Sequence, residues 1–137
     1  VVIETKRGHY LGQLIYEGEA IANTGIPGNI QGVDKDRVLR APKAGVTLNL
    51  HEIGDLVDKG EVILKVDGEP VKAIISGVVR GLIAPGFHVK KGQKIGDIDP
   101  RGDVDYVRTI SDKGRTIAGG VLEAILHHFM IDNHARA

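Results

Sequence analysis

An internal repeat constrains the fold of this chain more than any other feature. When the segment that begins at Ala41 is shifted by 32 positions, it aligns without a gap on the segment that begins at Ala73. The two copies lie within residues 39–100 and share ten identical positions: Ala41/Ala73, Gly45/Gly77, Val46/Val78, Leu50/Leu82, Gly54/Gly86, Val57/Val89, Lys59/Lys91, Gly60/Gly92, Ile63/Ile95 and Asp67/Asp99. A gapless repeat of two copies predicts two similar supersecondary units packed about a pseudo-two-fold axis.

Each copy of the repeat predicts strands rather than helices. A strand is expected after the first glycine of each copy, at residues 46–50 and 78–82, followed by a glycine-containing turn and a Val-x-Lys-Gly sequence. A second strand is expected at residues 62–66 and 94–98, because apolar alternation and glycine punctuation are typical of strands. The copies meet at Asp67-Gly68-Glu69-Pro70, whose Asp-Gly pair favours a tight hairpin turn.

The segments on either side of the repeat domain, which is expected at residues 38–100, differ from it. Residues 1–37 are expected to supply two short strands, at residues 1–3 and 14–16, and a structured loop at residues 23–29. Because the chain opens inside an apparent strand without an initiator methionine, we expect this region to continue from an absent N-terminal domain.

Residues 101–137 predict a loop and one C-terminal helix of four or five turns that packs on the repeat. Ser111 is expected to cap the helix, because a serine side chain accepts hydrogen bonds from free N–H groups in the first turn. Gly119 and Gly120 lie in the helix interior, where each glycine costs about 1 kcal/mol relative to alanine. Something is therefore expected to approach the helix backbone closely there, as in tight packing of the helix on a sheet.

The composition excludes several classes of partner. Lysine plus arginine (18) balance aspartate plus glutamate (18), and no basic stripe suggests nucleic acid as a partner. No apolar run approaches the roughly 18 residues that a membrane-spanning helix needs, so we expect no membrane partner and a cytoplasmic location. The absence of cysteine excludes disulfides and thiolate metal sites, and the histidines lack metal-binding spacing, so no metal site is predicted.

The repeat resembles the barrel-sandwich hybrid of biotinyl and lipoyl carrier domains, through its Val-x-Lys-Gly turns and its Ala-x-x-x-Gly-Val starts. This resemblance implies a mainly β fold, here with one C-terminal α-helix. Carrier domains place a modified lysine at the tip of the hairpin that joins the two halves. The tip here, at residues 67–70, contains no lysine, and Lys65 and Lys72 are expected on the flanking strands as solvated charges. We therefore expect no covalently attached biotin or lipoate.

Outside the repeat, five separated motifs resemble the C-terminal half of the selenium-dependent molybdenum hydroxylase accessory proteins. They are Glu4-Thr5-Lys6-Arg7-Gly8-His9, Asn23-Thr24-Gly25-Ile26-Pro27-Gly28, Arg37-Val38-Leu39-Arg40-Ala41-Pro42, Gly96-Asp97-Ile98-Asp99-Pro100-Arg101-Gly102, and the run from Ile110-Ser111-Asp112-Lys113 to Gly119-Gly120-Val121-Leu122-Glu123-Ala124-Ile125-Leu126. The resemblance implies a role in maturing a molybdenum hydroxylase, in handling its cofactor or its selenium. The implied partners are such a hydroxylase or the proteins that mature its cofactor.

Six residues are candidates for binding an anion or a cofactor: Arg7, His9, Arg101, Asp103, Ser111 and Lys113. The arginines lie in glycine-containing loops, and a guanidinium can bind a phosphate or a carboxylate through two parallel hydrogen bonds. Ser111 and Lys113 open the predicted helix, where free N–H groups and the helix dipole favour an anion. A non-covalent molybdopterin-type ligand or another small anion is the functional hypothesis, and local pairing and capping by these residues is the structural alternative.

Three functions are left open by the sequence. The first is a non-catalytic accessory module that acts as a scaffold or binds a small anion or cofactor. The second is part of an enzyme that acts on a small anionic substrate, with the six candidate residues converging at the junction with an absent N-terminal domain. The third is a homo-oligomer in which exposed edge strands pair between chains.

Overall fold

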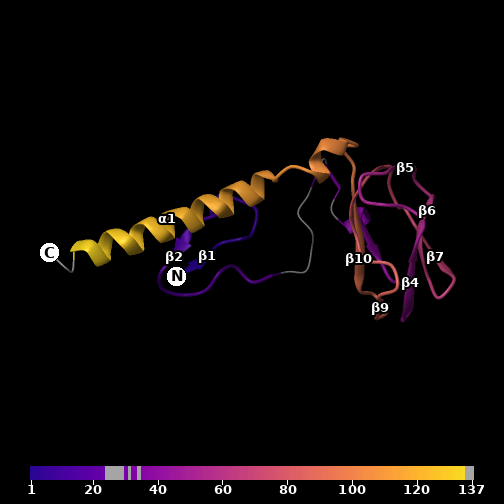
Figure 1. Cartoon of the computed structure of the whole chain (residues 1–137), viewed down its shortest axis with the longest axis horizontal. Helices are drawn as coiled ribbons and strands as arrows, with labels where there is room; N and C mark the ends of the chain where they lie inside the picture. The colour runs from indigo at the N-terminus through magenta and orange to yellow at the C-terminus, as the bar shows by residue number, and fades with distance from the viewer. Residues whose placement is uncertain (24–29, 31, 34, 135–137) are drawn as a thin grey trace. The chain divides into compact units, whose positions relative to one another are not determined.

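The computed structural model describes residues 1–23, 30, 32–33 and 35–134, and the side chains of residues 1–23, 30, 32–33 and 35–130. The chain divides into two compact units (Figure 1). Unit 1 comprises residues 1–25 and 110–137, and unit 2 comprises residues 26–109. The loop expected at residues 23–29 lies, from residue 24 onward, outside the described residues.

Unit 2 contains the repeat, folded as two four-stranded antiparallel sheets. One sheet has the order β3-β10-β8-β5, with β3 at Val38–Arg40, β10 at Lys94–Asp99, β8 at Gly77–Leu82 and β5 at Leu56–Val57. The other has the order β7-β6-β4-β9, with β7 at Glu69–Lys72, β6 at Val62–Val66, β4 at Gly45–Asn49 and β9 at His88–Val89. The sheets stay open rather than closing into a barrel. A mainly β, sandwich-like fold with one C-terminal helix is thus confirmed.

The pseudo-two-fold symmetry extends to every strand of unit 2. The 32-residue shift relates β3 to β7, β4 to β8, β5 to β9 and β6 to β10. The same exchange converts the order of one sheet into the order of the other. Each sheet therefore draws two strands from each copy, and neither copy forms a sheet of its own.

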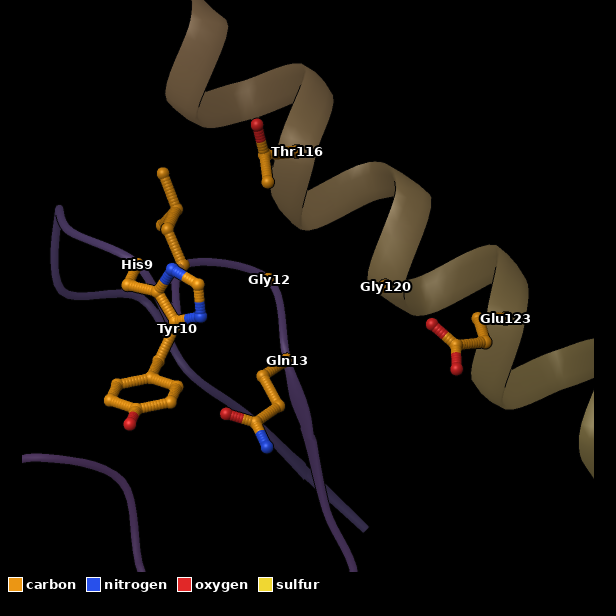
Figure 2. A pocket seen from close by; sticks show the side chains of 8 residues that line it. His9, Tyr10, Gly12, Gln13, Thr116, Gly120 and Glu123 are labelled. Atoms are coloured by element: carbon orange, nitrogen blue, oxygen red, sulfur yellow. The ribbon is translucent and has the colours of Figure 1, made fainter.

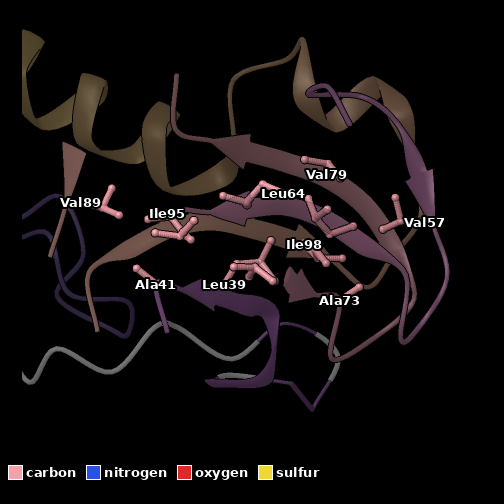
Figure 3. Packing of buried hydrophobic residues seen from close by; sticks show 12 residues of the cluster. Leu39, Ala41, Val57, Leu64, Ala73, Val79, Val89, Ile95 and Ile98 are labelled. Atoms are coloured by element: carbon pink, nitrogen blue, oxygen red, sulfur yellow. The ribbon is translucent and has the colours of Figure 1, made fainter. Parts of the chain in front are cut away.

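The hydrophobic core of unit 2 lies between the two sheets (Figure 3). Ile63 and Ile98 are fully buried there, as are Leu64 and Val79. Apolar residues point inward from both sheets because alternate side chains of a strand face opposite sides of the sheet. The core is thus built from equivalent positions in the two copies, such as Val57 and Val89.

The hairpin between β6 and β7 confirms the expected Asp-Gly turn. Val66 pairs with Glu69, which leaves Asp67 and Gly68 as a two-residue loop. Both loop residues have positive φ, 43° at Asp67 and 81° at Gly68, as a type I′ turn requires. Glu69 and the residues after it continue through Pro70 as strand β7, in agreement with the flanking strand that was expected to carry Lys72. β7 lies at the edge of its sheet, where a proline is tolerated.

Unit 1 contains a two-stranded antiparallel sheet and the long helix. β1 at Val2–Ile3 pairs with β2 at Leu14–Ile15, in agreement with the two short strands expected. Helix α1 spans Asp112–His134. With 23 residues and about 3.6 residues per turn, α1 is longer than the expected four or five turns. The expected length was wrong because the apolar pattern that defined it stops at Phe129, whereas the backbone continues as helix.

The compact units have different boundaries from the predicted segments 1–37, 38–100 and 101–137. The short 3-10 helices η1, at Lys35–Arg37, and η2, at Val104–Val107, belong to unit 2. Arg37 binds the carboxylate of Asp97 on β10 at 2.6 and 2.7 Å, and both side chains are largely buried. This ion pair joins the segment before the repeat to the sheet.

Candidate functional site

The candidate site in unit 1 is formed by the loop at residues 7–13 and one face of helix α1. The loop follows β1 and ends just before β2, so both of its ends are held by the small sheet. On the helix, Asp112, Thr116, Gly120 and Glu123 recur at intervals of three or four residues and therefore share a face. We call this arrangement the loop–helix site.

One end of the loop–helix site is held by an ion pair between Arg7 and Asp112. Both guanidinium Nη atoms donate to the Asp112 carboxylate, and the Nη2–Oδ1 distance is 2.9 Å. This fork geometry is the one that guanidinium and carboxylate favour. The predicted anion-binding guanidinium thus binds a carboxylate of the protein itself.

The middle of the site is a close approach between two glycines. A Cβ added at Gly120 would lie 2.2 Å from the carbonyl oxygen of Gly12, and one added at Gly12 would lie 2.8 Å from the Thr116 carbonyl. Gly12 also has a φ of 84°, which favours glycine. The expected close approach in the helix is confirmed at Gly120. At Gly119 an added Cβ would meet no atom within 4 Å.

Glu4 organises the chain on both sides of the loop. Its carboxylate accepts hydrogen bonds from the backbone N–H groups of Lys6 and Ile21, both at 2.7 Å. Its backbone N–H donates to the Gln13 carbonyl and its backbone carbonyl accepts from the Gly12 N–H, which ties the end of the loop to a residue that precedes it. The Ile21 and Lys6 N–H groups lower the pKa of Glu4 below its ordinary value, because they stabilise the charged form. Glu4 is 2% exposed, so this carboxylate is a buried structural anchor.

A pocket of about 430 Å³ lies between the loop and the helix (Figure 2). The loop contributes His9, Tyr10 and Gln13, and the helix contributes Thr116 and Glu123. The His9 and Tyr10 rings meet edge to face, with 5.1 Å between their centroids. The pocket therefore presents an imidazole, a phenol, an amide and a carboxylate, which are groups that bind polar ligands by hydrogen bonding.

At the start of helix α1, a free backbone N–H group is bound by a side chain of the protein itself. Ser111 Oγ accepts a hydrogen bond from the Gly114 N–H at 3.1 Å, which confirms the expected N-cap. Lys113 is partly buried and makes no ion pair with a described residue. Arg7, His9, Ser111 and Lys113 thus all belong to unit 1, with His9 lining the pocket and Ser111 acting as a cap.

The two other candidate residues, Arg101 and Asp103, belong to unit 2. Arg101 donates to Asp99 through its backbone N–H at 3.1 Å, through Nε at 2.9 Å and through Nη2 at 2.6 Å. Its guanidinium also lies 4.2 Å above the ring centre of Tyr106, a cation–π contact. Asp103 caps η2 by accepting the Asp105 N–H at 3.0 Å. The convergence of all six candidate residues at one site stays a prediction.

Asp99 is the centre of this second cluster. Its side chain is fully buried, and Arg80 donates to it at 2.9 Å in addition to Arg101. Hydrogen bonds from Arg101, supported by the charge of Arg101 and by Arg80, lower the pKa of Asp99 to about 2. Two guanidinium groups thus hold one carboxylate in its charged form.

The Asp99 cluster breaks the pseudo-symmetry of the repeat. The counterpart of Asp99 is Asp67, an exposed turn residue whose carboxylate accepts the Val46 N–H at 2.9 Å. The repeat counterparts of Arg80 and Arg101 are Leu48 and Glu69, so the first copy lacks both cations. The equivalent aspartate thus follows strand β6 in the first copy and ends strand β10 in the second, and it forms a buried ion cluster in the second copy alone.

Sequence reasoning missed several residues that build these two clusters. Glu4 and Asp99 each lie in one of the five motifs but were not selected as candidate residues, although the change from Leu48 to Arg80 between the copies could have indicated a charged partner for Asp99. Gln13 and Glu123 could not be identified from the sequence. They are far apart along the chain, and only the folded structure brings the loop and the helix together to form the pocket.

Metal sites and membrane-spanning helices are both absent from the described residues. Across the part of the chain that the structure describes, no three histidine, aspartate or glutamate side chains are grouped so that they could hold a metal ion. Within the same residues, no helix combines the length and the apolar character needed to cross a bilayer.

The chain is similar in sequence to a known protein over most of its length. The chain is 53% identical over 125 residues to the uncharacterized protein YqeB of Escherichia coli strain K12, covering 91% of this chain and 23% of that protein. The chain thus spans about a quarter of the length of this relative. No protein-family model matches the chain. Among solved structures, the ectoine utilization protein EutE (DoeB) from Ruegeria pomeroyi, with product bound, matches 48% of this chain and 22% of its own with 20% identity and a TM-score of 0.38, a likeness too distant to bear on fold or function.

Proposed function

We propose that this chain is an accessory module in the maturation of a selenium-dependent molybdenum hydroxylase, and that it acts by binding rather than by catalysis. The identity of the process is supported by the five sequence motifs that resemble the accessory proteins of such hydroxylases. The mode of action is supported by the geometry of the candidate residues.

The main support for a binding role rather than a catalytic one is that four of the six candidate residues have structural partners. Arg7 binds Asp112 and Arg101 binds Asp99, whereas Asp103 and Ser111 cap helices. A guanidinium that already forms two hydrogen bonds to a carboxylate binds a second anion only weakly, because the new ligand must first displace that carboxylate. These residues are therefore better suited to build a scaffold than to bind a substrate.

The pocket of the loop–helix site is the proposed ligand site. Gln13 offers an amide donor and acceptor, and Glu123 offers an acceptor for an N–H group, which together suit the edge of a nitrogen heterocycle. A molybdopterin-type ligand would place its ring at Gln13 and Glu123. Its phosphate would be directed away from the Glu123 carboxylate, because like charges repel. The other carboxylate on this face of the helix, Asp112, is eleven residues from Glu123, which corresponds to about 16 Å.

Helix α1 supplies a surface for a protein partner. Leu126, Phe129 and Met130 are more than half exposed. Leu122, Leu126 and Met130 line an apolar pocket of about 380 Å³ along the helix. Exposed apolar clusters of this kind are typical of surfaces that bind other proteins.

The test uses the natural full-length protein in a host that makes a selenium-dependent molybdenum hydroxylase. The gene is deleted and then restored as the wild type, as Gln13→Ala/Glu123→Ala, or as the control Arg115→Ala on an exposed part of the same helix. The hydroxylase is purified from each strain, and its molybdenum and selenium contents and its activity are measured.

We expect the deletion to lower the molybdenum or selenium content of the hydroxylase, the pocket variant to restore little, and the control to restore it fully. A fully loaded and active hydroxylase from the deletion strain would reject the accessory role. If the deletion has an effect but the pocket variant restores function fully, the accessory role stands and the proposed ligand site is wrong.

The alternative, part of an enzyme acting on a small anionic substrate, is supported by one observation. His9 and Glu123 line the same pocket, and an imidazole with a carboxylate is a common pair for proton transfer. In the same host, His9→Gln keeps a hydrogen-bonding side chain but removes the proton-transferring group. An effect as large as the deletion would favour the enzyme, and near-complete restoration would favour the binding module.

A further inference from the structure

A second pocket lies in unit 2, between the outer strands of the two sheets. β3 and β7 each form one edge of a sheet, and they are the strands that the repeat relates to each other. Between them is a pocket of about 420 Å³. This volume is in the range of small-molecule sites, which start at about 300 Å³.

The pocket is lined by equivalent residues of the two copies. Four repeat-related pairs contribute to it: Val38/Pro70, Leu39/Val71, Arg40/Lys72 and Pro42/Ile74. The pocket therefore lies on the pseudo-two-fold axis, so that whatever it binds meets the same kind of wall and the same charge from both strands.

Three of these pairs are apolar and one is cationic. Leu39 and Val71 are buried, and Ile74 is 47% exposed at the rim. Arg40 and Lys72 are exposed, and Lys35 of η1 adds a third cation to the lining. None of the described residues that line the pocket is an aspartate or a glutamate.

The two repeat-related cations of the pocket, Arg40 and Lys72, differ from Arg7 and Arg101 in that neither is paired with a carboxylate of the described residues. Arg40 donates from Nη1 to the Gly92 carbonyl at 3.0 Å, which positions its guanidinium without neutralising its charge. Lys72 forms no ion pair with a described residue, and the neighbouring carboxylate of Glu69 lies 4.0 Å from Lys43 instead. The pocket thus combines apolar walls with two cations that no carboxylate of the described residues pairs.

We propose that this pocket binds a small organic anion with an apolar body and a carboxylate or phosphate head group. The body would lie between the apolar side chains of β3 and β7, where water is displaced from apolar surface. The head group would interact with Arg40 and Lys72, because a guanidinium and an ammonium on either side of the axis can both reach one anionic group. This site lies in unit 2, and it does not depend on the role proposed for the loop–helix site.

The test uses the full chain and the fluorescent probe 8-anilinonaphthalene-1-sulfonate, which has an apolar ring system and an anionic group. Its affinity is measured for the wild type and for Arg40→Gln/Lys72→Gln. The control is Lys59→Gln/Lys91→Gln, which removes two exposed, repeat-related cations outside the pocket and so changes the net charge by the same amount. Octanoate and octyl phosphate are then tested as competitors, with inorganic phosphate to report on the head group alone.

We expect the pocket variant to weaken probe binding at least tenfold, and the control variant to leave it within twofold. Amide resonances of β3 and β7 should shift with the probe in the wild type, and octanoate or octyl phosphate should displace it better than inorganic phosphate. Which of the two displaces it better identifies the head group.

Three results would overturn the proposal. The first is an equal loss in the pocket and control variants, which would show an effect of net charge. The second is unchanged binding in the pocket variant. The third is a set of shifted resonances confined to helix α1, which would show that the probe binds the exposed apolar side chains there. Circular dichroism of each variant verifies that it is folded, and Ile74→Trp, which fills the rim, provides a second variant that should also exclude the probe.

Discussion

The carbonyl oxygen of Gly12 occupies the place where a side chain on Gly120 would begin, since an added Cβ would lie 2.2 Å from it. The loop and the helix of unit 1 therefore meet backbone to backbone. Gly119 and Gly120 are adjacent in the helix, but only Gly120 makes this contact, so substitutions at the two positions test it.

Replacement of Gly120 by alanine should destabilise unit 1, whereas replacement of Gly119 should not. Gly120→Ala forces the loop away from the helix, and we expect it to lower the free energy of unfolding by about 2 kcal/mol, a typical cost of overpacking. Gly119→Ala meets no atom within 4 Å, so alanine should stabilise the helix by up to about 1 kcal/mol. Chemical denaturation followed by circular dichroism measures both. Equal effects of the two substitutions would contradict the close approach.

The buried carboxylate of Asp99 should make unit 2 sensitive to acid. Its pKa is about 2 in the folded chain and 3.8 ordinarily, so folding favours the charged form. The stabilisation is fully present above about pH 5 and is lost as the pH falls through about 2, and it amounts to at most about 2.5 kcal/mol. The measurement is the free energy of unfolding between pH 2 and 6.

Asp99→Asn should remove this acid dependence and should cost about 3 kcal/mol near neutral pH, because two partly buried guanidinium groups lose their carboxylate. The matched control is Asp67→Asn at the equivalent position of the first copy. The amide oxygen that this substitution introduces can still accept the Val46 N–H, so we expect a loss below about 1 kcal/mol. Similar losses in the two variants would contradict the ion cluster.

Glu4 should report its own titration through the backbone groups that it binds. Its pKa is lowered from 4.5 by the N–H groups of Ile21 and Lys6, so these hydrogen bonds are intact above that pH and are lost as the pH falls through the lowered pKa. The amide resonances of Ile21 and Lys6 should therefore shift with a midpoint below pH 4.5. In Glu4→Gln this step should disappear and the Ile21 amide should exchange faster, whereas Glu17→Gln should change neither. A midpoint above 4.5 in the wild type would contradict the assigned contacts.

The ion pair between Arg7 and Asp112 should contribute little to stability despite its fork geometry. The two side chains are 38% and 70% exposed, and solvent screens such pairs. A double-mutant cycle with Arg7→Ala, Asp112→Ala and the double variant should give a coupling free energy below about 1 kcal/mol. A coupling above about 2 kcal/mol would mean that this pair, rather than the glycine contact, holds the loop on the helix.

The strands of the repeat could be predicted because their signals are local. Alternation marks β6 and β10, and the Asp67-Gly68 pair determines a two-residue turn wherever it joins two strands. The exchange of strands between the two sheets could not be predicted, because a gapless repeat is equally compatible with one sheet per copy. The edge position of β7, which makes Pro70 tolerable there, could not be predicted either, because it depends on the order of the strands in the sheet.

For the candidate site, sequence reasoning found residues but not their partners. It selected Arg7 and Arg101 as candidate anion-binding groups, with local pairing as the structural alternative, and each binds a carboxylate of the chain. Asp99 lies two residues from Arg101, so that pair could have been anticipated from proximity. Asp112 is 105 residues from Arg7, and only the path of the folded chain brings them together.

Because the two copies share both sheets, neither copy is expected to fold as a separate unit. Because each sheet takes two strands from each copy, a single copy keeps only one of its strand pairs, β4 with β6 or β8 with β10. Its other strands would need a second chain to complete the two sheets. In this chain the second copy meets that need, and it is joined to the first through the short turn between β6 and β7. By the same logic, cutting the backbone in that turn would leave two fragments that remain interlocked and should reassemble with each other rather than fold separately.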